Sequence, residues 1–264
     1  MAPTGFHGLL GLWFASKLDP KHNYVRVGLA AGSVIPDLDL LGSILIFILT
    51  GDKELAIAFH RSVTHSLVVI IVVLTIGYLV NLWFERAQTI YFPFIIGLIV
   101  GMVIHITLDM FYFDGVTLFW PFQPIGERTK IILFTYENLS PAFNSLEAKI
   151  IGTLDGHFEL IYYFVFAYLA DKYQKDQEMK IGFGSKKRII HNWPKKLRMV
   201  SFFLIIEAVF FLSLAFVSIS WPILDRDNFI ILLYVPLTPV YLLSGLLPFL
   251  MRETIVHLGN ESFQ

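Results

Sequence analysis

The sequence has no cysteine among its 264 residues. This absence excludes disulfide bonds and thiolate metal ligands, which leaves histidine and carboxylate side chains as the candidate ligands of any metal site. Charged residues are also scarce, at 16% of the chain compared with about 25% in an ordinary soluble domain. The formal net charge is −1, so no overall basicity attracts nucleic acid, and we expect no nucleic-acid partner.

Apolar side chains are abundant, at 56% of the residues. Four runs, 66–84, 90–113, 199–220 and 229–250, are near the ~20 residues that cross a bilayer. Two shorter runs, 40–50 and 158–170, fit short spans, re-entrant helices or helices buried in protein. Residues 5–18 predict a further amphipathic or buried helix. We therefore predict an all-α, integral membrane helical bundle with about four to six membrane helices plus this N-terminal helix.

Positive charge predicts the orientation of the bundle. Nine of the 20 lysine and arginine residues lie in a polar stretch, 171–198, which we interpret as a basic cytoplasmic loop of a cell (inner) membrane protein. If 158–170 crosses the bilayer, the polar candidates described next lie on the extracytoplasmic face. If it does not cross, they lie together on the cytoplasmic side.

The run 90–113 contains "GMVIHITLDMFYFDG". His105 and Asp109 are four residues apart, so a helix presents both side chains on one face. Ionisable groups inside a bilayer-length run are costly and usually face a protein interior or an aqueous cavity. The pair suits one divalent metal ion, and the alternative is a hydrogen-bonded His–Asp pair that locks two helices.

The stretch "GSVIPDLD" supplies two more carboxylates, Asp37 and Asp39. Pro36 indicates a turn. In an extended stretch, side chains two residues apart point the same way, so both acids would face one site. Alternatively, one of them caps the apolar helix that follows.

In "HRSVTHS", His60 and His65 are five residues apart. On one continuous helix they would lie about 140° apart, so we predict a loop-to-helix junction capped by Ser62 or Thr64. There both imidazoles turn toward one point, and Arg61 with the helix N-terminus favours an anion such as phosphate. The alternative is a polar belt at the membrane interface.

These motifs, in this order, resemble the YdjM-like family of membrane-bound predicted metal-dependent hydrolases. They are more distantly similar to zinc-dependent phospholipase C and P1-type nucleases. The matching pieces are His7, "GSVIPDLD", "HRSVTHS" and "GMVIHITLDMFYFDGVTLFWPF", all within residues 1–124. The resemblance implies an all-helical protein whose metal site lies near one membrane face.

The resemblance also implies a ligand set. His105 and Asp109 would be the helical pair, Asp37 a bridging carboxylate, and His60 or His65 a further ligand. His7 would come from the first helix, although a buried histidine satisfied by hydrogen bonds is its simpler interpretation. Weaker candidates are Asp114, where the distant enzymes have another histidine, and His157 and Glu159, which helix capping also explains. We expect one or two divalent ions, with zinc favoured and manganese or magnesium as alternatives.

The resulting hypothesis is a metal-dependent hydrolase of an ester, most favourably a phosphoester and including phospholipid, at the bilayer surface. Asp37 or Asp39 would bridge metals or orient water. Arg61 would neutralise phosphate charge, and Arg128 is a second candidate for that role. The predicted division is a hydrolase-like membrane domain (1–170), the basic loop (171–198) and a C-terminal transmembrane helix pair (199–264). A metal or proton transporter with His105 and Asp109 on its pathway, or a scaffold with a decayed site, are the alternatives.

Overall fold

The computed structural model describes residues 4–83, 90–111, 115–129, 131, 146–181, 193–217 and 226–261. Over these residues the chain is all-α, as predicted, with one isolated antiparallel bridge between Val116 and Thr129. The α-helices are α1 (Thr4–Ser16), α2 (Asn23–Gly32), α3 (Leu40–Thr50), α4 (Lys53–Phe59), α5 (Leu67–Trp83), α6 (Tyr91–Phe111), α7 (Leu146–Gly156), α8 (Glu159–Ile181), α9 (Trp193–Val217), α10 (Arg226–Leu250) and α11 (Arg252–Glu261). Two 3-10 helices, η1 (Pro20–His22) and η2 (Ile35–Asp39), flank α2.

Two helices, α6 and α9, are long and apolar enough to cross a membrane on their own. Two further pairs of helices are long and apolar enough only when their two parts are taken together. One pair is α2 with η2 and α3, bent by 43°, and the other is the second half of α10 with α11, bent by 63°. The predicted span 66–84 is the shorter apolar helix α5, of 17 residues. The described residues thus contain two to four candidate spans, compared with the predicted four to six.

Both ends of the predicted basic loop are helical. Helix α8 continues to Ile181 and α9 begins at Trp193, so the prediction of a loop over 171–198 was wrong at both ends. The polar stretch after Ala170 is rich in lysine, glutamine and glutamate, which are good helix formers. Polarity ends the membrane-like pattern there but does not end the helix.

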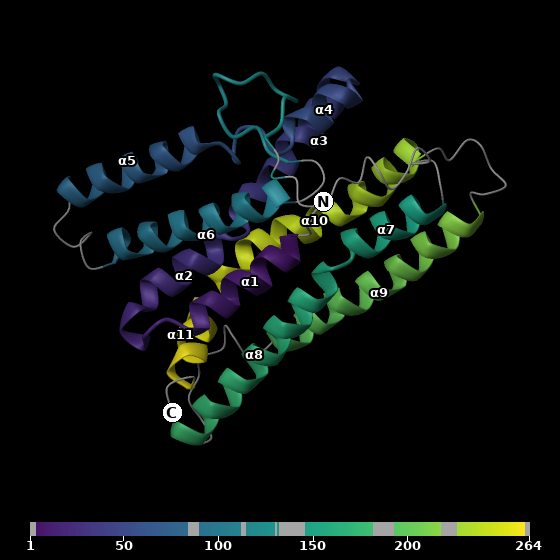
Figure 1. The fold of residues 1–264 in the computed structure, drawn as a ribbon. Helices are drawn as coiled ribbons and strands as arrows, with labels where there is room; N and C mark the ends of the chain where they lie inside the picture. The colour runs from purple at the N-terminus through teal and green to yellow at the C-terminus, as the bar shows by residue number, and fades with distance from the viewer. Residues whose placement is uncertain are drawn as a thin grey trace.

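The helices form one bundle (Figure 1). Helices α1, α6 and α10 all contact α2, while α8 and α9 pack along each other. The larger of two apolar core clusters in the described residues joins both ends of the chain, including Leu12, Phe166, Leu204 and Leu237. The end of α8 and helix α11 lie at one end of the bundle, and α3, α4 and residues 115–129 lie at the opposite end (Figure 1).

Backbone contact between α2 and α6 places the polar residues. A Cβ atom added at Gly97 would stand 2.1 Å from the carbonyl oxygen of Val25, and one added at Gly28 would stand 2.0 Å from that of Phe94. Small residues allow such close approach of helices in membranes. As a result, the C-terminal end of α2 lies directly beside the turn of α6 that carries His105.

Candidate metal centre

Four buried side chains converge at one point: Asp37 from η2, His65 from the junction before α5, and His105 and Asp109 from α6. One ligand atom from each lies within 4.8 Å of the other three. The Nε2 atoms of the two histidines are 3.0 Å apart. Asp37 Oδ1 lies 3.7 Å from His65 Nε2 and 3.4 Å from His105 Nε2. Asp109 Oδ2 lies 3.2 Å and 3.6 Å from the same two atoms.

These separations fit a tetrahedral ligand set. Zinc bonds nitrogen and oxygen at about 2.0–2.2 Å, so the edges of its ligand tetrahedron are about 3.4 Å long. Five of the six separations, from 3.0 to 3.7 Å, lie around that length, and the sixth, between the carboxylates of Asp37 and Asp109, is within 4.8 Å. Four donor atoms at these separations could surround one such cation.

The two imidazole rings are oriented by contacts of their Nδ1 atoms. His105 Nδ1 is 2.8 Å from the carbonyl oxygen of Ser33, an acceptor that fixes the ring proton on Nδ1. His65 Nδ1 faces Asp39 Oδ2 at 3.3 Å, an arrangement in which a carboxylate orients a metal-ligating histidine. The two Nε2 atoms therefore face each other at 3.0 Å, where both could coordinate one cation.

Asp37 presents one oxygen to this group, because Thr4 Oγ1 donates a 2.6 Å hydrogen bond to the other, Oδ2. The segment is a 3-10 helix with Pro36 in its first turn, so the expectation of an extended stretch was wrong. The tighter turn sends Asp37 and Asp39 to different sides of His65. Neither caps α3: Asp39 occupies the N-cap position, but its side chain makes no capping hydrogen bond.

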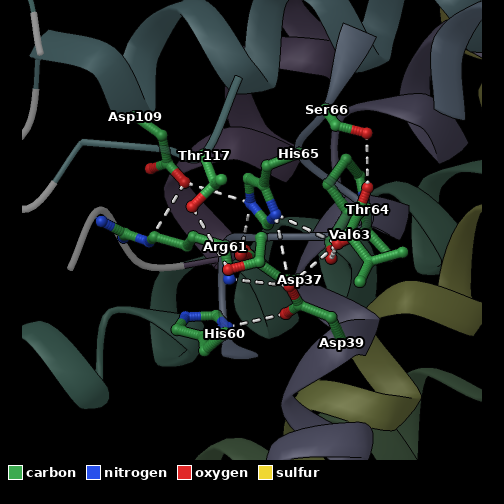
Figure 2. Close-up of polar contacts among 12 residues, drawn as sticks. Asp37, Asp39, His60, Arg61, Val63, Thr64, His65, Ser66, Asp109 and Thr117 are labelled. Carbon is green, nitrogen blue, oxygen red and sulfur yellow. Dashed lines mark hydrogen bonds and ion pairs between the residues drawn. The ribbon is translucent and has the colours of Figure 1, made fainter. Parts of the chain in front are cut away.

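Asp39 organises the H-R-S-V-T-H-S segment instead (Figure 2). Its Oδ1 accepts a 2.7 Å hydrogen bond from His60 Nδ1. Its Oδ2 accepts hydrogen bonds from Arg61 N at 2.8 Å and Thr64 Oγ1 at 2.9 Å. His60 is therefore committed to Asp39 and lies outside the four-residue group, with its ring centroid 6.1 Å from that of His65.

Arg61 adopts a left-handed backbone conformation, with φ of 65°, which is uncommon for a residue with a side chain. Two hydrogen bonds hold this backbone: Arg61 N donates to Asp39 Oδ2, and Thr117 N donates to the carbonyl oxygen of Arg61 at 3.0 Å. The fully buried side chain reaches Asp109, with Nε 3.3 Å from Oδ2 (Figure 2). A guanidinium thus lies directly beside the ligand group.

His7 packs against His105 and Asp109 of α6. Its ring stacks on that of His105 at a centroid distance of 3.8 Å, and its Nε2 lies 3.2 Å from Asp109 Oδ1. Burial and the neighbouring His105 hold the pKa of His7 below its ordinary value, although Asp109 opposes them. Burial also disfavours the charge on His65, but Asp39, Asp109 and Asp37 outweigh it and raise the pKa of His65 well above its ordinary value. The negative potential at this point favours a cation.

The junction before α5 differs in detail from the prediction. Ser66 Oγ accepts from Val69 N at 3.3 Å and caps α5, whereas Ser62 and Thr64 donate elsewhere, so the predicted cap was wrong. The loop-to-helix junction itself is confirmed, because His60 and His65 both precede Leu67. Arg128 Nη2 contacts the carbonyl oxygen of His60 at 3.4 Å, at the edge of the site.

A protein-family model described as YdjM inner membrane protein matches residues 3–177. The chain belongs to the YdjM inner membrane protein family. The match covers all four residues of the candidate metal centre, together with His7, Asp39, His60 and Arg61. No curated protein and no solved structure matches the chain.

Ser244, which lies outside the YdjM match, supports the centre through Glu159, which lies inside it. Glu159, the first residue of α8, accepts a 2.5 Å hydrogen bond from Gly5 N and a 2.6 Å bond from Ser244 Oγ on α10. It thereby fixes the start of α1, from which Thr4 reaches Asp37. Burial raises the pKa of Glu159 to about 8, against the hydrogen bonds from Ser244 and Gly5.

Glu159 and His157, the weaker ligand candidates, are thus placed outside the four-residue group. His157 Nδ1 is 2.7 Å from the carbonyl oxygen of Thr153 in the preceding turn. Asp114 lies outside the described residues. Sequence reasoning missed the supporting roles of Thr4, Ser33, Thr117 and Ser244. Thr4 and Ser244 stand outside the quoted motifs, whereas Ser33 and Thr117 stand inside them but act through backbone atoms.

Proposed function

We propose that this protein is a membrane-bound, metal-dependent hydrolase that cleaves a phosphoester. The observation that carries the proposal is the convergence of Asp37, His65, His105 and Asp109 with their ligand atoms within 4.8 Å of one another. Two nitrogen and two oxygen donors without sulfur suit zinc best, with manganese as the alternative. The four-residue group accounts for one ion, the lower of the two numbers expected.

The chain's own residues contribute positioning and charge. A bound divalent ion supplies a Lewis acid and lowers the pKa of a coordinated water to about 7. Asp39 orients the His65 ring through its Nδ1 atom and fixes the backbone at Arg61 through a hydrogen bond from the Arg61 amide. The Arg61 guanidinium, beside Asp109, is placed to neutralise phosphate charge as it develops in the transition state. Arg128 supports the same edge through the backbone of His60.

The distribution of positive charge supports a site on the extracytoplasmic face of the inner membrane. The basic stretch 171–198 begins in the second half of α8, whose end lies opposite the α3 and α4 end of the bundle (Figure 1). His105 and Asp109 belong to the last two turns of α6, toward that opposite end. If positive residues stay inside, the metal centre faces out.

The test is a phosphoesterase assay on purified protein that has been stripped with EDTA and reloaded with zinc, manganese or magnesium. We expect one bound ion per chain and EDTA-sensitive turnover, both lost in His105→Ala and Asp109→Ala. His22→Ala removes an exposed histidine of η1 and serves as the matched control. Full activity in the two α6 variants would contradict the proposal. Bound metal with ion flux in proteoliposomes and no turnover would support the transporter alternative.

A further inference from the structure

Residues 115–129, "GVTLFWPFQPIGERT", form a segment after α6 that we call the aromatic loop. Its first twelve residues carry no charge, and three of its apolar side chains are exposed. Phe119 is 52% exposed, Phe122 is 87% exposed and Ile125 is 40% exposed. Phe122 is more exposed than any other large hydrophobic residue in the described part of the chain. A tip of this kind is unfavourable in water.

The base of the aromatic loop is fixed to the metal centre. Val116 and Thr129 exchange two backbone hydrogen bonds, of 3.1 Å and 2.7 Å, which close the loop. Thr117 N donates to the carbonyl oxygen of Arg61, and Leu118 O accepts from Leu67 N. The loop therefore holds a defined position relative to the segment that carries Arg61 and His65.

The loop also lies close to the end of a membrane span. Helix α6 is one of the two described helices that are long and apolar enough to cross a membrane on their own. It ends at Phe111, four residues before the loop begins. The boundary between hydrocarbon and headgroups is where tryptophan and other aromatic side chains gather in membrane proteins. The uncharged "LFWPF" tip is suited to that boundary. Its exposed aromatic side chains are unfavourable in water, and its non-helical backbone is unfavourable at the hydrocarbon centre.

We propose that the aromatic loop inserts into the headgroup region of the surrounding bilayer and that the substrate is a phospholipid drawn from that region. This inference rests on the proposed function. The tip would place the metal centre and Arg61 next to lipid phosphates. In the reaction, a water oxygen bonds to phosphorus, one phosphorus–oxygen ester bond breaks, and the departing oxygen takes up a proton from that water.

The position of the loop is tested without any activity measurement. Because the chain has no cysteine, Phe122→Cys and Glu127→Cys each provide a single site for a nitroxide label in proteoliposomes. We expect the label at Phe122 to be relaxed more by oxygen, which partitions into lipid, than by a water-soluble nickel chelate. The label at Glu127, in the base of the loop, should show the reverse order. A water-exposed label at Phe122 would overturn insertion of the loop.

The substrate class is tested by comparing two substrates. Phe119→Ser and Phe122→Ser should lower turnover of phospholipid in vesicles at least about tenfold while changing turnover of a soluble phosphoester less than about twofold. Trp83→Ser, which removes an 81% exposed side chain at the far end of α5, is the control and should change neither.

The outcomes separate the two proposals. No turnover of either substrate by the metal-loaded wild-type protein counts against the proposed function, and the label then still decides whether the loop inserts. Turnover of soluble phosphoester with equal effects of the variants on both substrates overturns the lipid substrate alone. A selective loss on vesicles supports it.

Discussion

The Nε2 atoms of His65 and His105 lie 3.0 Å apart although the residues are separated by 40 positions in the chain. The Nδ1 atom of each ring already faces an oxygen, that of Asp39 or that of Ser33. Both Nε2 atoms are therefore directed at the same point, flanked by the carboxylates of Asp37 and Asp109. Four buried donor atoms in this arrangement could hold a metal ion, and the proposed function rests on this relationship.

Asp37 and Asp39 should differ in their effect on metal affinity. Asp37→Ala removes a ligand atom, and we expect loss of stoichiometric zinc binding. Asp39→Asn keeps the ligand set but weakens the orientation of His65, which should lower affinity about 10–100-fold. Competition with a chromophoric chelator measures both constants. Asp19→Asn, an exposed cap of η1, is the control, and equal losses for the two site variants would contradict the assigned roles.

Arg61→Lys should separate charge from geometry. Lysine retains the positive charge beside Asp109, so we expect the bound metal to be retained. It lacks the planar fork that matches phosphate, and turnover of a phosphoester should fall about 100–1,000-fold. Metal analysis and steady-state kinetics on the same sample check both statements. Arg198→Lys, at an exposed ion pair with Asp171, should change neither quantity.

The contact between α2 and α6 should be intolerant of a single methyl group. In Gly101→Ala the new Cβ would stand 2.4 Å from the carbonyl oxygen of Leu29 and 2.8 Å from Ser33 N, both backbone atoms. We expect a loss of about 1–3 kcal/mol of stability, because the helices must separate. Metal affinity should fall as well, since Ser33 then moves away from His105. Thermal unfolding in detergent measures the first effect.

Gly152→Ala is the matched control for that substitution. Gly152 lies inside α7, and a Cβ there would meet no atom within 4 Å. Alanine favours a helix over glycine by about 1 kcal/mol, so this variant should be slightly more stable than the wild type. A Gly101→Ala protein as stable as wild type would show that the helices do not pack as closely as described.

The buried Glu159 predicts a pH dependence of stability. Its pKa is raised from 4.5 to about 8 in the folded protein, so folding favours the protonated form. The contribution is fully present below about pH 4.5 and is lost as the pH rises through about 8, with a limiting slope of about 1.4 kcal/mol per pH unit. Glu159→Gln should flatten this dependence in thermal unfolding. Glu54→Gln, at an exposed position on α4, should leave it unchanged.

The sequence predicted the membrane class and the ligand types because both depend on local chemistry. Apolar runs of bilayer length define spans, and the absence of cysteine leaves histidine and carboxylate ligands. The pairing of His105 with Asp109 follows from helix geometry alone, since residues four apart share a face. The need for a junction between His60 and His65 follows from the same geometry.

Which residues meet was decided by the tertiary structure. His60 and His65 are equivalent in the motif, yet Asp39 binds His60 and leaves His65 to face His105. Asp37 and Asp39 are equally acidic, yet the 3-10 turn sends one to the ligand group and the other behind it. Nothing in the local sequence marks Ser33 or Ser244 as part of the site, and only helix packing places them beside His105 and Glu159. Local rules fix the direction of a side chain within its own element, whereas long-range packing of α2, α6 and α10 fixes its neighbours.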